Sequence, residues 1–370
     1  MLGLALGGVS RADDTPKQRA SAVLEAAARD GFSGTVCVES GGATLVDSAF
    51  GWADDRHSRR VDPDTLYHVA SVTKLVTAIA VLKLAEQRKL ALADPLGKWF
   101  PEAPPDKAAI TIEQLLLHQS GLGQNYAADG IASRDAAVRA VLATALSFPP
   151  GTAQKYSNDG MNLVAAVIEK ASGRSYRDFV HDEILAPAGL KRSLLWEEVN
   201  PRKTQNLAVP AAGAATGPAA GRNWGLMGGD GFWSNARELT RLMRAVVGGR
   251  ILRPESVKAL SEPRFDSQDG DFTNLGWFTR VEPRQPRLLW IRGTEQNGFN
   301  AALYWYPDAD LILAITTNLG PFESGRVTVS RALANRLEQA LLPARAPDAS
   351  GRAQHQDRVR AAEAERVGQR

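Results

Sequence analysis

The sequence predicts an α+β fold, in which both ends of the chain build one antiparallel sheet flanked by helices and a mainly helical region is inserted between them. Two observations carry this prediction. Strand-like segments occur within 30–55 and again within 272–342, whereas apolar residues in 70–270 recur at helical spacing. Strands at the two ends with helices between them are typical of one sheet closed by both termini.

The strand-like segments at the start of the chain are 32–40 and 43–52. The dipeptide Gly41-Gly42 between them supplies the backbone freedom of a tight turn and predicts a hairpin. Later strand-like segments are 275–281, 287–292, 300–306 and 311–318. The turn sequence 307–310 joins the last two, which predicts a second hairpin.

Helix signals occupy the middle of the chain. Helical spacing relates Leu163, Val164, Val167 and Ile168, and Gly173 is placed to end that helix. Two capping pairs predict further helix starts: Ser175 with Asp178, and Asn235 with Glu238. The segment 210–221 is rich in Ala, Gly and Pro and is expected to be a loop.

Composition excludes several function classes. The chain has 370 residues, 44% hydrophobic and 23% charged, which is ordinary for a globular protein, and its net charge of +3 is too small to indicate nucleic-acid binding. A single cysteine, Cys37, allows neither an intrachain disulfide nor a thiolate metal cluster. The five histidines lack zinc-site spacing, and we expect His68 and His118 to be structural. No metal or cofactor is predicted.

The most informative motif is Ser71 followed by Lys74, the only Ser-x-x-Lys in the chain. Residues three apart share one face of a helix, so the hydroxyl and the amine can meet. A lysine with a lowered pKa can accept the serine proton and so create a nucleophile. Taken alone, the pair fits a helix-capping serine followed by a surface lysine better than a catalytic pair.

A second motif is Tyr156-Ser157-Asn158, which follows a loop rich in proline and glycine. In an extended segment, residues two apart point to the same side, so Tyr156 and Asn158 are expected to face one space. The alternative is a packed tyrosine followed by an asparagine that caps the next helix.

In combination, four segments resemble the serine β-lactamase and penicillin-binding-protein superfamily, in its branch of class C β-lactamases, D-alanyl-D-alanine carboxypeptidases and family VIII carboxylesterases. In chain order they are 64–74, 115–122, 150–158 and 228–234. The resemblance covers the chain from about residue 30 to about residue 340 and implies a β-lactamase/transpeptidase-like fold.

The resemblance implies roles for four of these residues. Ser71 would be the acylated nucleophile, with Lys74 and Tyr156 as a coupled pair that moves its proton. Asn158 would hold a substrate amide or orient Lys74. Family members carry a further triplet, Lys-Thr-Gly or His-x-Gly, on a strand beside the site.

Counting back from Gly298 and Phe299 places that triplet at 292–294, so that Arg292 supplies its cation. Arg292 would then bind a carboxylate or stabilise an anionic Tyr156. In this alignment the backbone N–H groups of Ser71 and Glu295 would form the oxyanion hole. A one-residue slip would instead place Gly293 at the triplet's glycine and Ile291 at its cation.

The sequence therefore predicts a serine hydrolase that forms an acyl-enzyme with a small ester, amide or peptide. A carboxylesterase or peptidase/amidase is ranked first. The alternatives are a class C-like β-lactamase and a binding or regulatory protein that keeps the fold without turnover.

Domain boundaries follow from these segments. Residues 15–342 are predicted to form the catalytic domain, with 343–370 as a disordered tail. Residues 1–14 begin with an apolar run and are interpreted as the remnant of a secretory signal, the alternative being a frayed N-terminus. We therefore expect a periplasmic or secreted protein, and otherwise a cytoplasmic one, without a membrane span.

Overall fold

The computed structural model describes residues 14–200, 203–210, 221–266, 271–282, 285–295, 298–320 and 327–342. Its helices are α1 (Pro16–Arg29), α2 (Thr73–Glu86), α3 (Leu96–Trp99), α4 (Pro105–Ala108), α5 (Ile112–Leu116), α6 (Arg134–Leu142), α7 (Asn158–Ser172), α8 (Tyr176–Val180), α9 (Ala186–Ala188), α10 (Ala236–Val247), α11 (Pro254–Ser261) and α12 (Val329–Leu341). Short 3₁₀ or π turns are η1 (Ala70–Val72), η2 (His181–Leu185), η3 (Trp196–Glu198), η4 (Trp224–Leu226) and η5 (Pro307–Ala309).

The strands are β1 (Gly34–Ser40), β2 (Ala43–Phe50), β3 (Tyr67–His68), β4 (Leu194–Leu195), β5 (Phe232–Ser234), β6 (Phe265–Asp266), β7 (Asp271–Thr273), β8 (Phe278–Arg280), β9 (Leu288–Thr294), β10 (Asn300–Tyr306) and β11 (Leu311–Thr317). Eight of them form one sheet in the order β2-β1-β11-β10-β9-β8-β7-β6. Every neighbouring pair is antiparallel, and β1 joins the end of the chain through β11, where Gly34 pairs with Thr317.

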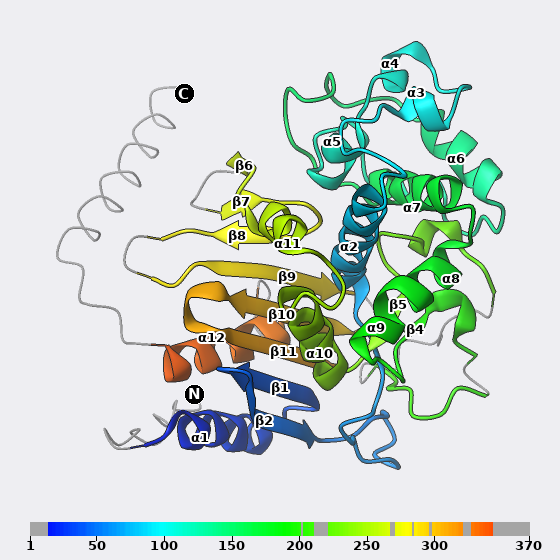
Figure 1. Ribbon diagram of the computed structural model, residues 1–370. Helices are drawn as coiled ribbons and strands as arrows, with labels where there is room; N and C mark the ends of the chain where they lie inside the picture. The colour runs from blue at the N-terminus through cyan, green and yellow to red at the C-terminus, as the bar shows by residue number, and fades with distance from the viewer. Residues whose placement is uncertain are drawn as a thin grey trace, which may run out of the picture.

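The two faces of the sheet are covered by different helices. On one face, α1 and α12 bury Leu24 and Leu337 against strand residues such as Val36 and Leu313. On the other face, the core contains Cys37 and Ala314 of the sheet together with α2, α10 and the helical region. Figure 1 shows α1 and α12 beside the sheet and the helical region extending from its far end.

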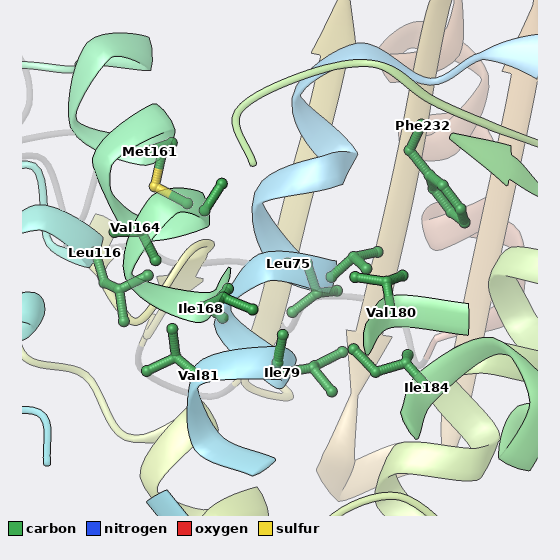
Figure 2. Close-up of a cluster of buried hydrophobic side chains, with 14 of the residues drawn as sticks. Leu75, Ile79, Val81, Leu116, Met161, Val164, Ile168, Val180, Ile184 and Phe232 are labelled. Carbon is green, nitrogen blue, oxygen red and sulfur yellow. The ribbon is translucent and has the colours of Figure 1, made fainter. Parts of the chain in front are cut away.

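Helix α2 runs through the middle of the larger core. All of its residues from Thr73 to Leu82 are buried, as expected for a helix that is apolar on every side. Figure 2 shows Leu75 and Ile79 of α2 between Ile168 of α7 and Val180 of α8. Because α2 is fixed on all sides, the residues at its first turn are held rigidly.

A second, three-stranded sheet, in the order β3-β5-β4, lies at the start of η1. Tyr67 pairs with Ser234 and His68 with Trp233. Val69 continues this contact by donating its N–H to Phe232 O over 2.9 Å. These strands are two or three residues long, too short for alternation to reveal them in the sequence.

The predicted architecture is confirmed in its main elements. Both hairpins form, Gly173 ends α7 in the left-handed conformation, and Ser175 and Asn235 cap α8 and α10. The assignment of 272–342 to the sheet is wrong at its end, because 329–341 form helix α12, whose apolar stripe packs on the sheet. Helix α1 was not predicted.

Several predictions fall on undescribed residues. The signal remnant up to residue 13, most of the loop 210–221 and the tail 343–370 lie outside the described residues. Among the helices that are described, none combines the length and apolar character needed to cross a membrane.

Candidate active site

Ser71 lies in η1, at the junction between β3 and α2. The residue before it, Ala70, has φ of 49°, a left-handed conformation that costs a non-glycine residue about 1–2 kcal/mol. Thr73 holds the turn by donating its hydroxyl to Ala70 O at 2.6 Å and accepting the N–H of Phe232 at 3.1 Å. The turn leaves Ser71 partly exposed between buried neighbours, as a nucleophile requires.

Lys74 stands one helical turn after Ser71, and only 1% of it is exposed. Its Nζ donates to Ser71 Oγ at 3.0 Å and to Gly229 O at 2.6 Å. Nζ also lies 4.7 Å from the centre of the Tyr156 ring. The predicted meeting of the Ser71 hydroxyl and the Lys74 amine is therefore present in the structure.

Tyr156 approaches Ser71 from the segment that leads into α7. Its hydroxyl lies 2.6 Å from Ser71 Oγ, within hydrogen-bonding distance. The side chains of Ser71, Lys74 and Tyr156 thus form one contiguous group, assembled from η1, α2 and the start of α7.

His118 supports this segment from behind. Its ring centre lies 4.5 Å from that of Tyr156, its Nδ1 accepts the N–H of Ser157 at 3.3 Å, and its carbonyl accepts the N–H of Lys155. Burial, together with the charge of Lys74, lowers the pKa of His118 to about 3. The imidazole is therefore neutral near pH 7 and packs against the tyrosine, in agreement with the structural role expected for it.

Asn158 is the first residue of α7 and is 7% exposed. Its Oδ1 is buried and has no hydrogen-bond partner among the described residues. A Cβ built on Gly229, the residue whose carbonyl accepts from Lys74, would stand 3.4 Å from this oxygen. Asn158 therefore lies next to the group formed by Ser71, Lys74 and Tyr156, with an unused acceptor.

Arg292 does not face this group. Its guanidinium carbon lies 3.7 Å from the ring centre of Trp290, and Arg292 pairs in the sheet with Ala302, which belongs to the core under α1 and α12. Burial lowers the pKa of Arg292, since this face offers little solvent. The expectation that Arg292 supplies the cation beside Ser71 is therefore wrong.

Gly293 is the residue of β9 that faces the nucleophile. A Cβ built there would stand 2.0 Å from Val69 O and 3.0 Å from Ala70 Cβ, a clash that only glycine avoids. The slipped alignment is thus the correct one, with Gly293 at the glycine of the triplet and Ile291, a buried core residue, at the cation position. Counting back from Gly298 placed the triplet one residue too far along the chain. The contact with Val69 O, which only a glycine at 293 permits, gives the correct register of β9.

The oxyanion hole changes accordingly. The N–H of Glu295 donates to Phe299 O at 2.8 Å, so it is not available to a substrate and the expectation for this group is wrong. Successive amides of an antiparallel strand point to opposite edges, which directs the N–H of Thr294 away from β10 and toward the edge that packs on η1. The sequence reasoning did not single out the N–H of Thr294, which is the amide of β9 that points toward this edge.

The side chain of Glu295 belongs to a titratable cluster that also includes His68 and Asp230. Asp230 Oδ1 lies 3.2 Å from His68 Nε2, and Glu295 Oε1 lies 3.7 Å from His68 Nδ1. Burial and the charge of Asp230 raise the pKa of Glu295 to about 8. Burial alone would raise the pKa of Asp230. The charge and hydrogen bond of His68, with smaller contributions from Lys74 and Glu295, outweigh burial and lower the pKa.

One ligand atom from each member of this cluster lies within 4.8 Å of the others, which is the only group of potential metal ligands in the described segments. The sequence reasoning treated His68 as structural and did not single out Asp230. The segment 228–234 nevertheless contains Asp230, and its resemblance to the family was the available signal.

Comparison with known proteins places this geometry in context. A family model described as Beta-lactamase matches residues 19–338. Penicillin-binding protein 4* of Bacillus subtilis is 34% identical over 174 residues, which are 45% of this chain and 38% of that protein. Esterase EstB of Burkholderia gladioli is 34% identical over 171 residues, 40% of this chain and 43% of EstB.

A third relative is the teichoic acid D-alanine hydrolase of Staphylococcus aureus, 31% identical over 173 residues, 46% of this chain and 43% of that protein. In all three cases the match spans less than half of the relative's length.

Solved structures agree on the fold. A class C beta lactamase from Rhodobacter sphaeroides matches with a TM-score of 0.71 at 20% identity, over 87% of this chain and 98% of that one. The octameric penicillin-binding protein homologue from Pyrococcus abyssi also reaches 0.71, at 21% identity over 88% of this chain and 78% of that one.

Proposed function

Because the chain belongs to the beta-lactamase family, we propose that it is a serine hydrolase that works through an acyl-enzyme on esters or amides. The observation that carries the proposal is the contact of Ser71 Oγ with both Tyr156 and Lys74, at 2.6 and 3.0 Å. A serine hydroxyl becomes a useful nucleophile only where a neighbouring group accepts its proton, and here two such groups are in place.

Acylation begins when Ser71 Oγ forms a bond to the substrate carbonyl carbon and gives its proton to the coupled pair of Tyr156 and Lys74. The carbonyl oxygen becomes negative and accepts hydrogen bonds from the N–H groups of Ser71 and Thr294. The bond from the carbonyl carbon to the alcohol or amine then breaks, and the leaving group takes the proton from the pair.

Deacylation repeats these steps with water. A water molecule gives a proton to Tyr156 and Lys74 while its oxygen bonds to the acyl carbon. The bond between that carbon and Ser71 Oγ then breaks, the proton returns to Oγ, and the acid leaves. The two N–H groups serve both halves of the reaction.

Within this chemistry we rank a carboxylesterase or a peptidase/amidase above a β-lactamase. β-Lactams carry a carboxylate, which a cation on the strand beside the site would bind. On β9 that position is Ile291, which is buried in the core, and Arg292 lies on the opposite face of the sheet. The Asp230 carboxylate, whose pKa is lowered, adds a negative charge near Lys74, which disfavours an anionic substrate.

The proposal is tested by labelling with a fluorophosphonate, which reacts with activated serines. We expect one adduct, located on Ser71 by peptide mass spectrometry, its loss in Ser71→Ala, and its retention in Ser58→Ala, which removes an exposed hydroxyl. An unlabelled wild-type protein that also fails to react with fluorescent penicillin would be a binding protein. Faster turnover of nitrocefin than of short-chain esters or D-alanyl peptides would reverse the ranking.

A further inference from the structure

The carboxylate of Glu295 lies on the face of β9 that meets the nucleophile. Gly293 marks this face, because a Cβ built there would stand 3.0 Å from Ala70 Cβ. Side chains two residues apart on a strand point to the same side, and the hydrogen bond from Glu295 N to Phe299 O keeps Glu295 within the ladder. Its 3.7 Å approach to His68, three residues before Ser71, agrees with this placement.

Asp230 provides a second carboxylate beside the same group. It follows Gly229, whose carbonyl accepts from Lys74, and its Oδ1 lies 3.2 Å from His68. The exposed fraction rises from 12% for the Asp230 side chain to 26% for that of Glu295. Glu295 is therefore the carboxylate that a ligand can reach, and Asp230 lies deeper.

The amide oxygen of Asn158 is a third acceptor beside the two carboxyl groups. We call Glu295, Asp230 and Asn158 together the acidic wall. Asn158 Oδ1 is buried without a partner, on a residue that is 7% exposed, and it lies next to the position of Gly229. A buried acceptor without a donor destabilises the site, so a ligand that brings hydrogen-bond donors is favoured here.

We propose that the acidic wall binds a primary ammonium group on the acyl part of the substrate, so that the enzyme acts on aminoacyl esters or amides. This inference rests on the proposed function and names its substrate class. Thr294 supplies the amide for the carbonyl oxygen, and Glu295 is the next residue, so a cation a few bonds from the carbonyl carbon meets its carboxylate. The α-ammonium of an aminoacyl group is two bonds from that carbon.

The charges around Glu295 support a cationic ligand. His68 on β3 and Lys74 on α2 face it as the positive groups, and Asp230 faces it as the negative one. Burial and the charge of Asp230 raise the pKa of Glu295 to about 8, and the protonated carboxyl group is hydrogen-bonded to Asp230. An ammonium beside Glu295 would favour its ionised form, so binding near pH 7 would release a proton from Glu295.

A metal ion fits the same cluster less well. His68 Nε2 accepts the N–H of Gly231 at 3.1 Å, so an ion would have to bind Nδ1. Asp230 lies at Nε2, and a side-chain hydrogen bond joins it to Glu295, which an ion between the two carboxylates would break. An ammonium needs no ring nitrogen and can bind the exposed carboxylate directly.

The test compares esters that differ only in the cation. D-alanine and L-alanine methyl esters carry an ammonium where methyl isobutyrate carries a methyl group, and hydrolysis of all three is followed by titration of the released acid at pH 7. We expect kcat/KM for at least one alanine ester to exceed that for methyl isobutyrate by about tenfold or more. The variant Glu295→Gln should reduce this ratio about tenfold, whereas Glu102→Gln, an exposed matched control, should preserve it.

An unchanged ratio in Glu295→Gln, or a wild-type preference for methyl isobutyrate, overturns the inference. Binding to the Ser71→Ala protein separates this result from failure of the proposed function, because intact esters can be titrated by calorimetry without turnover. If the wild type hydrolyses none of the esters, the proposed function fails. Tighter binding of an alanine ester that depends on Glu295, with proton release, would still uphold the ammonium site.

Equal binding of the alanine esters and methyl isobutyrate by the Ser71→Ala protein would overturn the inference of an ammonium site. The same calorimetric experiment is run with Zn²⁺ and Mn²⁺ alone. Stoichiometric binding of either metal that Glu295→Gln abolishes would assign the cluster to a metal ion and also overturn the inference.

Discussion

The hydroxyl of Tyr156 lies 2.6 Å from Ser71 Oγ, while Lys74 Nζ donates to the same oxygen from 3.0 Å. Ser71 Oγ is therefore shared between a phenol and an amine, and its proton has a direct path to the phenol oxygen. The amine lies 4.7 Å from the centre of the phenol ring. In the proposed reaction, proton transfer therefore belongs to the pair and not to one residue.

The variant Tyr156→Phe removes that path and leaves the ring packed against His118. We expect kcat for a short-chain ester to fall about 10²- to 10⁴-fold, the range associated with loss of general acid–base catalysis. The melting temperature should change little, since the lost hydroxyl faces the substrate side of Ser71.

Ser58→Ala is the control for this change. It removes an exposed hydroxyl and should alter kcat less than about threefold, far below the expected effect at Tyr156. Equal rates for Tyr156→Phe and wild type, measured by stopped-flow acylation, would assign the proton transfer to Lys74 alone.

The variant Gly293→Ala tests the contact between β9 and the nucleophile turn. The new methyl group would stand 2.0 Å from Val69 O, so β9 must move away from η1. We expect a loss of about 1–3 kcal/mol in the free energy of unfolding, as for other overpacked sites. Displacement of the Thr294 amide by about 1 Å should lower kcat roughly 10²-fold.

Gly320→Ala is the matched control for Gly293→Ala, because its Cβ would meet nothing within 4 Å. Chemical denaturation and ester hydrolysis should give values near wild type for this control. If Gly293→Ala behaves like Gly320→Ala, then β9 does not depend on this contact and the alignment of the triplet must be reconsidered.

The pH dependence of stability should report on His118. Its pKa is about 3 in the folded protein and about 6.5 in an unfolded chain, so below pH 6.5 the unfolded state binds the extra proton. The contribution of His118 is present above pH 6.5 and is lost as the pH falls toward 3, by up to about 1.4 kcal/mol per pH unit.

Urea denaturation at a series of pH values measures this effect. His118→Asn should flatten the decline between pH 6.5 and 4, whereas His57→Asn, which changes an exposed histidine, should retain the wild-type slope. A wild-type slope in His118→Asn would mean that the buried imidazole is already protonated in the folded protein.

The sequence predicted the parts of the site that local spacing determines. Ser71 and Lys74 meet because three residues make one turn, and Tyr156 follows a recognisable loop. The position of Arg292 could not be obtained in this way. Whether it or Gly293 faces the nucleophile depends on a contact with Val69, more than 200 positions away, and a one-residue shift reverses both faces of a strand.

Dependence on contacts between distant segments also explains the other differences between the sequence predictions and the structure. The small sheet is made of strands with two or three residues, which carry no detectable alternation. Helix α12 contains an apolar stripe that fits the sheet, yet the neighbouring strands led to its assignment as part of the sheet. His68, Asp230 and Glu295 come from three distant segments, so only the folded chain reveals them as a cluster.

The pairing of Gly34 with Thr317 has a consequence for folding of the chain during its synthesis on the ribosome. Strand β1 is synthesised among the first residues but has no β11 to pair with until nearly 300 further residues have been added. The serine turn emerges long before β9, whose Gly293 and Thr294 complete its surroundings. Because such distant pairings form slowly and late, Ser71 should stay chemically inert in the nascent chain and gain its reactivity only after the last strands are released.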